Sequence, residues 1–245
     1  MIRYHGLPFS GVMENQLSLQ GRHACVSHAY AALLPNALEV CQSVILDNGA
    51  FTAWKSGTPF DIDGFMSWAT SSLRHPGVDW ALIPDVIDGN EYDNDALLDL
   101  CPVEPAWVPV WHLHESLQRL YRLLDYPRVA LGSSGEYAVI GTHAWWARMA
   151  QAFDVCCDLD GYPVTKLHGL RMLDPRITSV FPFASADSTS VGRNIGIDVK
   201  WSGAYAPRSR RMRAAILIER VEAHATASRW AGSLNAAWAN SELLG

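Results

Sequence analysis

The fold is indicated by one stretch of the sequence, Ile45-Leu46-Asp47-Asn48-Gly49-Ala50-Phe51-Thr52. It begins as an apolar run, reaches an acid at Asp47 and continues into a turn of small residues followed by an aromatic residue. An α/β barrel presents its catalytic groups in this way, because the carboxyl ends of its parallel strands form one rim that carries the functional loops. The stretch therefore predicts a buried strand that ends on a functional carboxylate.

Two later apolar runs also end on an acid. Residues 81–85 close on Asp85, and residues 180–187 close on Asp187. Repetition of the pattern indicates one architecture used several times along the chain. Each of the three aspartates could instead cap the helix that follows its strand, a role that requires no function.

Apolar runs of four to eight residues alternate with longer amphipathic stretches, as is typical of repeated βα units. The expected strands cover 23–28, 43–47, 79–84, 107–111, 128–132, 164–168 and 179–184. The expected helices cover 29–40, 61–74, 91–100, 115–125, 142–153, 170–176 and 209–230. We therefore expect an α/β protein with a single TIM-like (β/α)₈ barrel, complete or with one irregular unit. A doubly wound sheet is the alternative, but no G-x-G-x-x-G or Walker motif follows the first strand.

No linker or composition break divides the chain, so we expect one domain over residues 1–245. Its catalytic core would cover about 23–195, and a C-terminal helix with a basic strip would lie within about 200–230. Hydrophobic residues make up 49% of the chain and charged residues 18%, which is typical of a globular enzyme and excludes a disordered chain.

The sequence favours a cytoplasmic protein that does not contact membranes. No apolar run reaches the roughly 18 residues that span a bilayer, and the first residues lack the apolar core of a signal peptide. Five scattered cysteines without a C-x-x-C pair indicate neither a disulfide framework nor a zinc ribbon.

The net charge of −6 does not favour nonspecific binding of nucleic acid by the whole surface. One basic strip near the C-terminus could nevertheless contact phosphates, and so could Arg193. The alternative is the solvated beginning of a helix. The residues of the strip are Lys200, Arg208, Arg210, Arg211 and Arg213.

Read in order, the strand-end motifs resemble those of the tRNA-guanine transglycosylase superfamily, including its phage DNA-modifying relatives. The resemblance covers roughly residues 23–195, and it depends on the order of the motifs and their placement at successive strand ends. The matching segments are 46–51, 83–87, 109–114, 129–136, 166–170 and 186–189.

The resemblance implies exchange of a base at C1′ of a nucleotide, through an oxocarbenium-like transition state and without a cofactor. It assigns the nucleophile to Asp187 and the acid/base role to Asp47. Asp85 would read the base, because one carboxylate can accept both adjacent donors of guanine or of a 7-deazaguanine.

Three further residues are expected to bind the base. The backbone of Gly132 would approach its edge, and Phe51 would stack on its face. His112 stands in the region where the family often has a glutamine.

The chain departs from the tRNA-acting members of the family, which usually carry a Cys-x-Cys-x-x-Cys plus His zinc site after the nucleophile. No cysteine follows Cys157 here, so no such zinc site is expected. The resemblance therefore points to short phage-type relatives that insert 7-deazaguanines into DNA, with DNA favoured over tRNA as partner. Such an enzyme must extrude the nucleotide or act on a single strand.

Two other functions remain open from the sequence. His112 and His114 could bind a metal, with His168 or Glu115 completing the site, in a metal-dependent barrel hydrolase. The chain could also be a noncatalytic nucleic-acid-binding subunit of a transglycosylase. Most of the ten tryptophans are expected in the core, although Trp54 or Trp111 could line a pocket.

Overall fold

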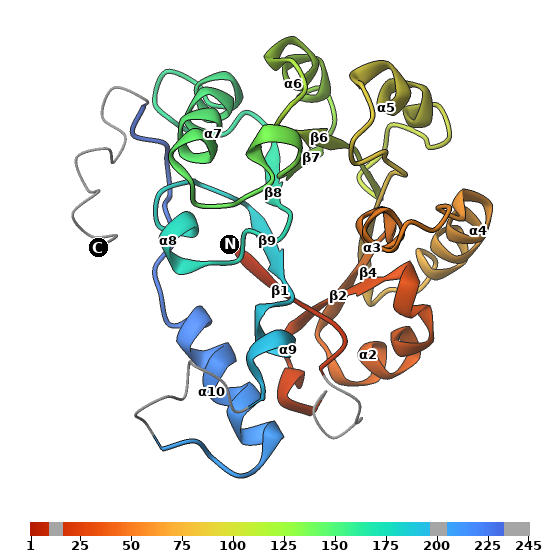
Figure 1. The fold of residues 1–245 in the computed structure, drawn as a ribbon, viewed down its shortest axis with the longest axis vertical. Helices are drawn as coiled ribbons and strands as arrows, with labels where there is room; N and C mark the ends of the chain where they lie inside the picture. The colour runs from red at the N-terminus through yellow and green to blue at the C-terminus, as the bar shows by residue number, and fades with distance from the viewer. Residues whose placement is uncertain (10–16, 197–204, 233–245) are drawn as a thin grey trace.

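The structure is a computed structural model that describes residues 1–9, 17–196 and 205–232, and its strands form one parallel sheet at the centre of the molecule (Figure 1). The strands are β1 (Ile2–Gly6), β2 (His23–Ser27), β3 (Ser43–Asp47), β4 (Val78–Leu82), β5 (Trp107–Val108), β6 (Val110–His112), β7 (Arg128–Gly132), β8 (Lys166–Gly169) and β9 (Ser185–Ser188).

The sheet closes into a barrel because β5 and β6 behave as one interrupted strand. The strand order is β5-β4-β3-β2-β1-β9-β8-β7-β6, so β5 and β6 stand at its two ends although only Pro109 separates them in sequence. Proline cannot donate to a ladder, but the Pro109 carbonyl still accepts from the Ala130 N–H at 2.9 Å. The expected α/β barrel is confirmed, and the doubly wound alternative is wrong.

Helices surround the strands and alternate with them along the chain (Figure 1). Several begin at a residue whose side chain caps the first turn; Asp61, for example, accepts from the Gly64 N–H at 3.0 Å. The α-helices are α2 (Leu34–Val40), α3 (Ala50–Ser56), α4 (Ile62–Ser72), α5 (Glu91–Leu98), α6 (Leu117–Leu123), α7 (His143–Cys156), α8 (Pro175–Thr178), α9 (Ser190–Asn194) and α10 (Arg210–Glu222). The 3₁₀-helices are η1 (Leu17–Leu19), η2 (His28–Leu33) and η3 (Gly135–Tyr137).

Five elements differ from the sequence prediction as follows. Strand β1 and helix α3 were not expected. The last strand is Ser185–Ser188 instead of 179–184, because Phe181 and Phe183 pack with Phe153 in an aromatic cluster around α7. No helix covers 170–174; α8 begins only at Pro175, and α10 ends at Glu222 instead of near 230.

The barrel interior is filled with buried side chains, which pack beneath the C-terminal rim. Near the opposite end, the buried Tyr4 hydroxyl donates to Asp79 at 2.5 Å. The interior cluster consists of Tyr4, Cys25, Ile45, Trp80, Leu82, Val108, Val110 and Ala130. Within the described ranges, no helix combines the length and apolar character needed to cross a membrane.

Tyr4 tests the contribution of the unexpected strand β1. Tyr4→Ala should lower the free energy of unfolding by about 3–5 kcal/mol, because it empties a fully buried aromatic site next to the seam between β1 and β9. Denaturant titration followed by circular dichroism measures the change. The control is Ile2→Ala on the same strand, where a 37% exposed side chain should cost less than about 1 kcal/mol. Equal losses in the two variants would contradict the packing described for β1.

Candidate active site

Three aspartates from distant parts of the chain meet at the C-terminal mouth of the barrel. Asp47 ends β3, Asp187 lies in β9, and Asp85 follows β4. Burial raises the pKa of Asp47 to about 6; the Ser27 hydroxyl and the Gly49 N–H act in the opposite direction, while the charges of Asp187 and Asp85 raise it further. The side chain is enclosed by protein yet keeps partial contact with solvent. Asp187 and Asp85 are therefore close enough to Asp47 to affect its ionisation.

Asp187 has one oxygen held by donors and one left open. Its Oδ1 accepts from the Arg171 backbone N–H at 2.9 Å and lies 3.3 Å from His168 Nε2. No hydrogen bond reaches Oδ2 from the described residues. The carboxylate is buried, with 6% of the residue exposed, so its orientation is fixed while Oδ2 remains available for chemistry.

A chain of donors beneath Asp187 sets the state of His168. Arg128 donates to the Ser185 hydroxyl at 3.0 Å, and that hydroxyl lies 2.9 Å from His168 Nδ1. Since the Ser185 oxygen accepts from Arg128, its proton is free for Nδ1, which leaves Nε2 to donate to Asp187. Complete burial lowers the pKa of His168, although the neighbouring Asp187 acts in the opposite direction. A neutral ring with a proton on Nε2 fits these contacts.

Asp85 is held from two sides. Asn48 Nδ2 donates to Asp85 Oδ1 at 2.6 Å and to the Ile83 carbonyl at 2.9 Å, while its own Oδ1 accepts from the Ala50 N–H. His112 Nε2 lies 2.8 Å from Asp85 Oδ2. The carboxylate oxygen does not lie along the direction of the ring N–H. The two atoms are therefore within ion-pair distance but do not form a hydrogen bond.

His112 rests on a buried ionic network. Its backbone N–H donates to Glu115 at 2.8 Å, and Glu115 also accepts from Arg119 at 2.7 Å and from Asn94 at 2.8 Å. These contacts fix the end of β6. The Nδ1 atom of His112 is buried and has no partner among the described residues, so it is a polar group available to a ligand.

The three-histidine metal site suggested by the sequence is wrong. Both ring nitrogens of His114 are engaged, with the Ser134 hydroxyl at 2.7 Å and the Gly89 carbonyl at 2.9 Å. His168 lies inside the barrel between Ser185 and Asp187. Within the described residues, no three His, Cys, Asp or Glu side chains gather in a way that could hold a metal ion.

The other expected base-binding residues also reach the mouth. A side chain at Gly132 would meet His112 Nδ1 at 3.3 Å, so glycine leaves room beside that nitrogen. Phe51 lies in α3, with the Arg171 guanidinium 4.3 Å from its ring centroid. Asn48 and Arg171 were missed as site residues. Asn48 stood within the decisive motif, whereas nothing in the sequence marked Arg171.

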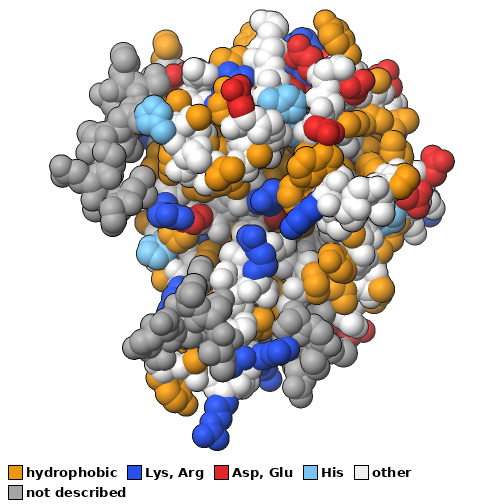
Figure 2. Space-filling model, viewed as in Figure 1, with side chains coloured by type: hydrophobic (Ala, Val, Ile, Leu, Met, Phe, Trp, Pro, Cys, Tyr) orange, Lys and Arg blue, Asp and Glu red, His pale blue; other side chains and the backbone are white. Residues whose placement is uncertain are grey.

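Only some residues of the predicted basic strip lie on the surface, where they could contact phosphates. Arg213 is wrong as a phosphate ligand, because it is 4% exposed and donates to the carbonyls of Ile195, Pro207 and Arg208. Lys200 lies outside the described residues. Exposed basic residues remain at Arg193, Arg208, Arg210 and Arg211, and Figure 2 shows Lys and Arg side chains gathered around the middle of the face that it presents.

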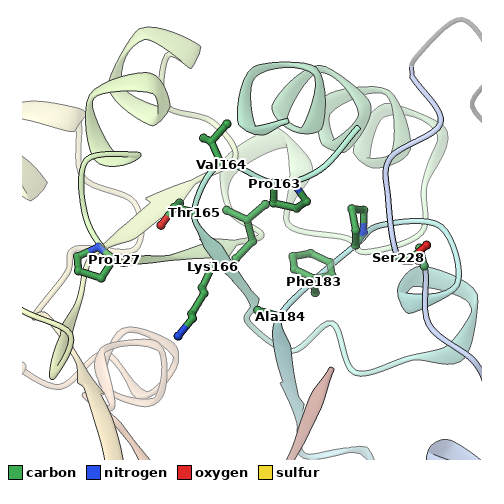
Figure 3. A pocket seen from close by; sticks show the side chains of 11 residues that line it. Pro127, Pro163, Val164, Thr165, Lys166, Phe183, Ala184 and Ser228 are labelled. Atoms are coloured by element: carbon green, nitrogen blue, oxygen red, sulfur yellow. The ribbon is translucent and has the colours of Figure 1, made fainter. Parts of the chain in front are cut away.

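A pocket of about 570 Å³ lies at the other end of the barrel (Figure 3). Pro127, Lys166 and Ala184 line it, and they stand where β7, β8 and β9 begin. Because the three aspartates stand where strands end, this pocket is separate from the candidate site.

Comparisons with known proteins identify the fold alone. No protein-family model matches the chain, and no curated protein sequence matches it. One similar structure comes from a study of the mutual activation of the tryptophan synthase α2β2 complex from Pyrococcus furiosus. It is 13% identical in sequence, with a TM-score of 0.50, and the match covers 90% of this chain and 96% of that chain. A mutant tryptophan synthase alpha-subunit from the same organism is 12% identical, with a TM-score of 0.52 over 91% of this chain and 97% of that chain.

The raised pKa of Asp47 has a consequence for stability. Below about pH 4 the carboxyl is protonated in both the folded and the unfolded chain, and the stability gained from its higher folded pKa is lost as the pH rises through about 6. Asp47→Asn, which removes the charge, should therefore match the wild type at pH 4 and exceed it by about 1–2 kcal/mol at pH 8. Denaturant titrations at the two pH values, with the exposed Asp125→Asn as control, measure the difference. A pH-independent effect would contradict the raised pKa of the buried Asp47 carboxyl.

Proposed function

We propose that the protein is a transglycosylase that exchanges guanine in a polynucleotide, DNA in preference to tRNA, for a 7-deazaguanine base. The observation that carries the proposal is the meeting of Asp47 and Asp187 in unlike environments. One carboxyl is held as an acceptor by a backbone N–H and a histidine, and the other has a pKa near neutrality. Two carboxyl groups in such unlike environments are suited to divide nucleophilic and acid/base roles.

The first half of the reaction breaks the bond between the sugar and guanine. Asp187 Oδ2 attacks C1′ and forms a glycosyl ester while the electron pair of the C1′–N bond leaves with the base. Protonated Asp47 gives its proton to the departing guanine. The Arg171 N–H and His168 hold Asp187 in place for the attack, and no cofactor is required by these steps.

The second half repeats these steps in reverse with a different base. Asp47, now ionised, takes the proton of the incoming 7-deazaguanine, whose nitrogen attacks C1′ and releases Asp187. Two displacements at C1′ retain the anomeric configuration, as in retaining glycosidases. A pKa of about 6 lets Asp47 exchange protons near neutral pH.

Asp85 is the proposed reader of the base. Asn48 and His112 fix both of its oxygens, and each carboxylate oxygen has a second lone pair for a ligand donor. The open Nδ1 of His112 beside Gly132 supplies another polar contact for the base edge. This rigid group of side chains supports discrimination by hydrogen bonding, which is far stronger than discrimination by shape alone.

Incorporation of a labelled 7-deazaguanine into a guanine-containing DNA strand tests the proposal. Asp187→Asn should abolish incorporation, because it removes the nucleophile. Asp47→Asn should slow incorporation by about 10²-fold or more, because it removes the group that transfers the proton. Circular dichroism verifies that the variants fold. Asp125→Asn, an exposed acid just before β7, is the matched control and should keep full activity.

Nucleoside analysis by mass spectrometry of DNA and tRNA from expressing cells then identifies the polymer. Normal incorporation by Asp187→Asn would refute its role. DNA binding that is unchanged in Asp47→Asn, with no exchange of any base, would instead favour a noncatalytic nucleic-acid-binding subunit.

A further inference from the structure

A row of three side chains leads from the aspartates out to solvent. The Arg171 guanidinium lies over the Phe51 ring at 4.3 Å, and the Phe51 and Trp54 ring centroids are 5.7 Å apart with a 38° tilt. Phe51 and Trp54 are three residues apart in α3 and therefore share one face of the helix. Trp54 is 48% exposed, so this row ends in a wide aromatic surface that is open to ligands.

Two arginines give this row a positive charge. Neither Arg171 nor Arg193 forms a salt bridge with any carboxylate of the described residues. They lie near each other, since burial lowers the pKa of Arg171 and the charge of Arg193 acts in the same direction. The Asp187 charge acts on Arg171 in the opposite direction but forms no salt bridge with it. Two neighbouring guanidinium groups that no salt bridge engages are suited to bind an anion such as a phosphate.

The backbone of Arg171 connects the row to the reaction centre. Its φ is 61°, a left-handed conformation that no other non-glycine residue adopts in the described part of the chain. This conformation costs about 1 kcal/mol or more and is common at functional sites. Here it directs the N–H to Asp187 while the side chain covers Phe51.

We propose that Arg171, Phe51 and Trp54 form a binding track for an unpaired DNA strand. The base next to the reacting nucleotide stacks on Trp54, and Arg171 and Arg193 hold the phosphates. When the target base arrives, it takes the place of the Arg171 guanidinium on the Phe51 ring, and the guanidinium moves to the adjacent phosphate. The assignment of a reacting nucleotide rests on the proposed function, whereas strand binding by the track does not.

The geometry favours a single strand over a duplex. Bases in a duplex have both faces covered by their neighbours and cannot stack on a protein ring without being extruded. Unpaired bases present a free face, and stacking on an aromatic side chain contributes about 1–3 kcal/mol per base. The tilt between Phe51 and Trp54 also departs from the parallel stacking of a continuous helix.

Binding of a fluorescent twelve-residue oligodeoxythymidine, measured by anisotropy, tests the track without requiring guanine exchange. Trp54→Ala and Arg171→Ala should each weaken binding by about tenfold or more, and Trp54→Phe should restore much of the affinity. Arg171→Ala should also reduce by about one the slope of the logarithm of the binding constant against the logarithm of the salt concentration, because one phosphate contact is lost. Tyr121→Ala removes an aromatic side chain that is 64% exposed on α6, and should change nothing.

The alternatives give distinct results. Absence of oligodeoxythymidine binding, wild-type affinity in both alanine variants, or equal affinity for a duplex of the same length would overturn the track, and so would exclusive binding of oligouridine. Trp54-dependent strand binding without exchange of any base would retain the track and refute the transglycosylase proposal. Base exchange with unchanged oligonucleotide binding in the variants would refute the track alone.

Discussion

Repulsion among three carboxyl groups at one barrel mouth is the constraint on which the site depends. Such a cluster is stable only if each charge is compensated or removed. Asp187 receives a backbone N–H and a histidine, and Asp85 receives Asn48 and a histidine. Asp47 accepts from the Gly49 N–H, but its burial, together with the charges of Asp187 and Asp85, raises its pKa to about 6. The proposal thus gives the proton transfers to a carboxyl group whose pKa lies near neutrality.

The scaffold supplies this arrangement through closure of the sheet. Strands β5 and β6, separated by Pro109 alone, act as one strand between β4 and β7 and close the barrel. The carboxyl ends of all strands therefore share one rim, where residues 140 positions apart in sequence become neighbours. Beneath the rim, the fully buried Ser185 and His168 are joined to the half-buried Arg128 by hydrogen bonds that fix the histidine tautomer. Rigid strands thereby hold the carboxylates, while the loops and α3 contribute the open, basic and aromatic surface around them.

The sequence predicted the parts of the fold that depend on local pattern. An apolar strand followed by an acid is a local signal, and it located Asp47 and Asp85. Asp187 was located as well, although it lies within β9 and the apolar run 179–184 before it is not a strand. Strand β1 was missed because Arg3 and His5 interrupt its apolar character, and their partners are the His224 carbonyl and Glu222, more than 200 residues away. The left-handed conformation of Arg171 depends on its contact with Asp187. Long-range contacts of this kind leave no periodic trace in a sequence.

A covalent intermediate is the most direct consequence of the proposed chemistry. The protein is incubated with a guanine-containing single strand, quenched in acid, digested and analysed by mass spectrometry. We expect the strand, less its guanine, to be attached through C1′ to the peptide that contains Asp187, and the adduct to disappear when 7-deazaguanine is added before the quench. An adduct on another residue, or one that persists in Asp187→Asn, would contradict the account.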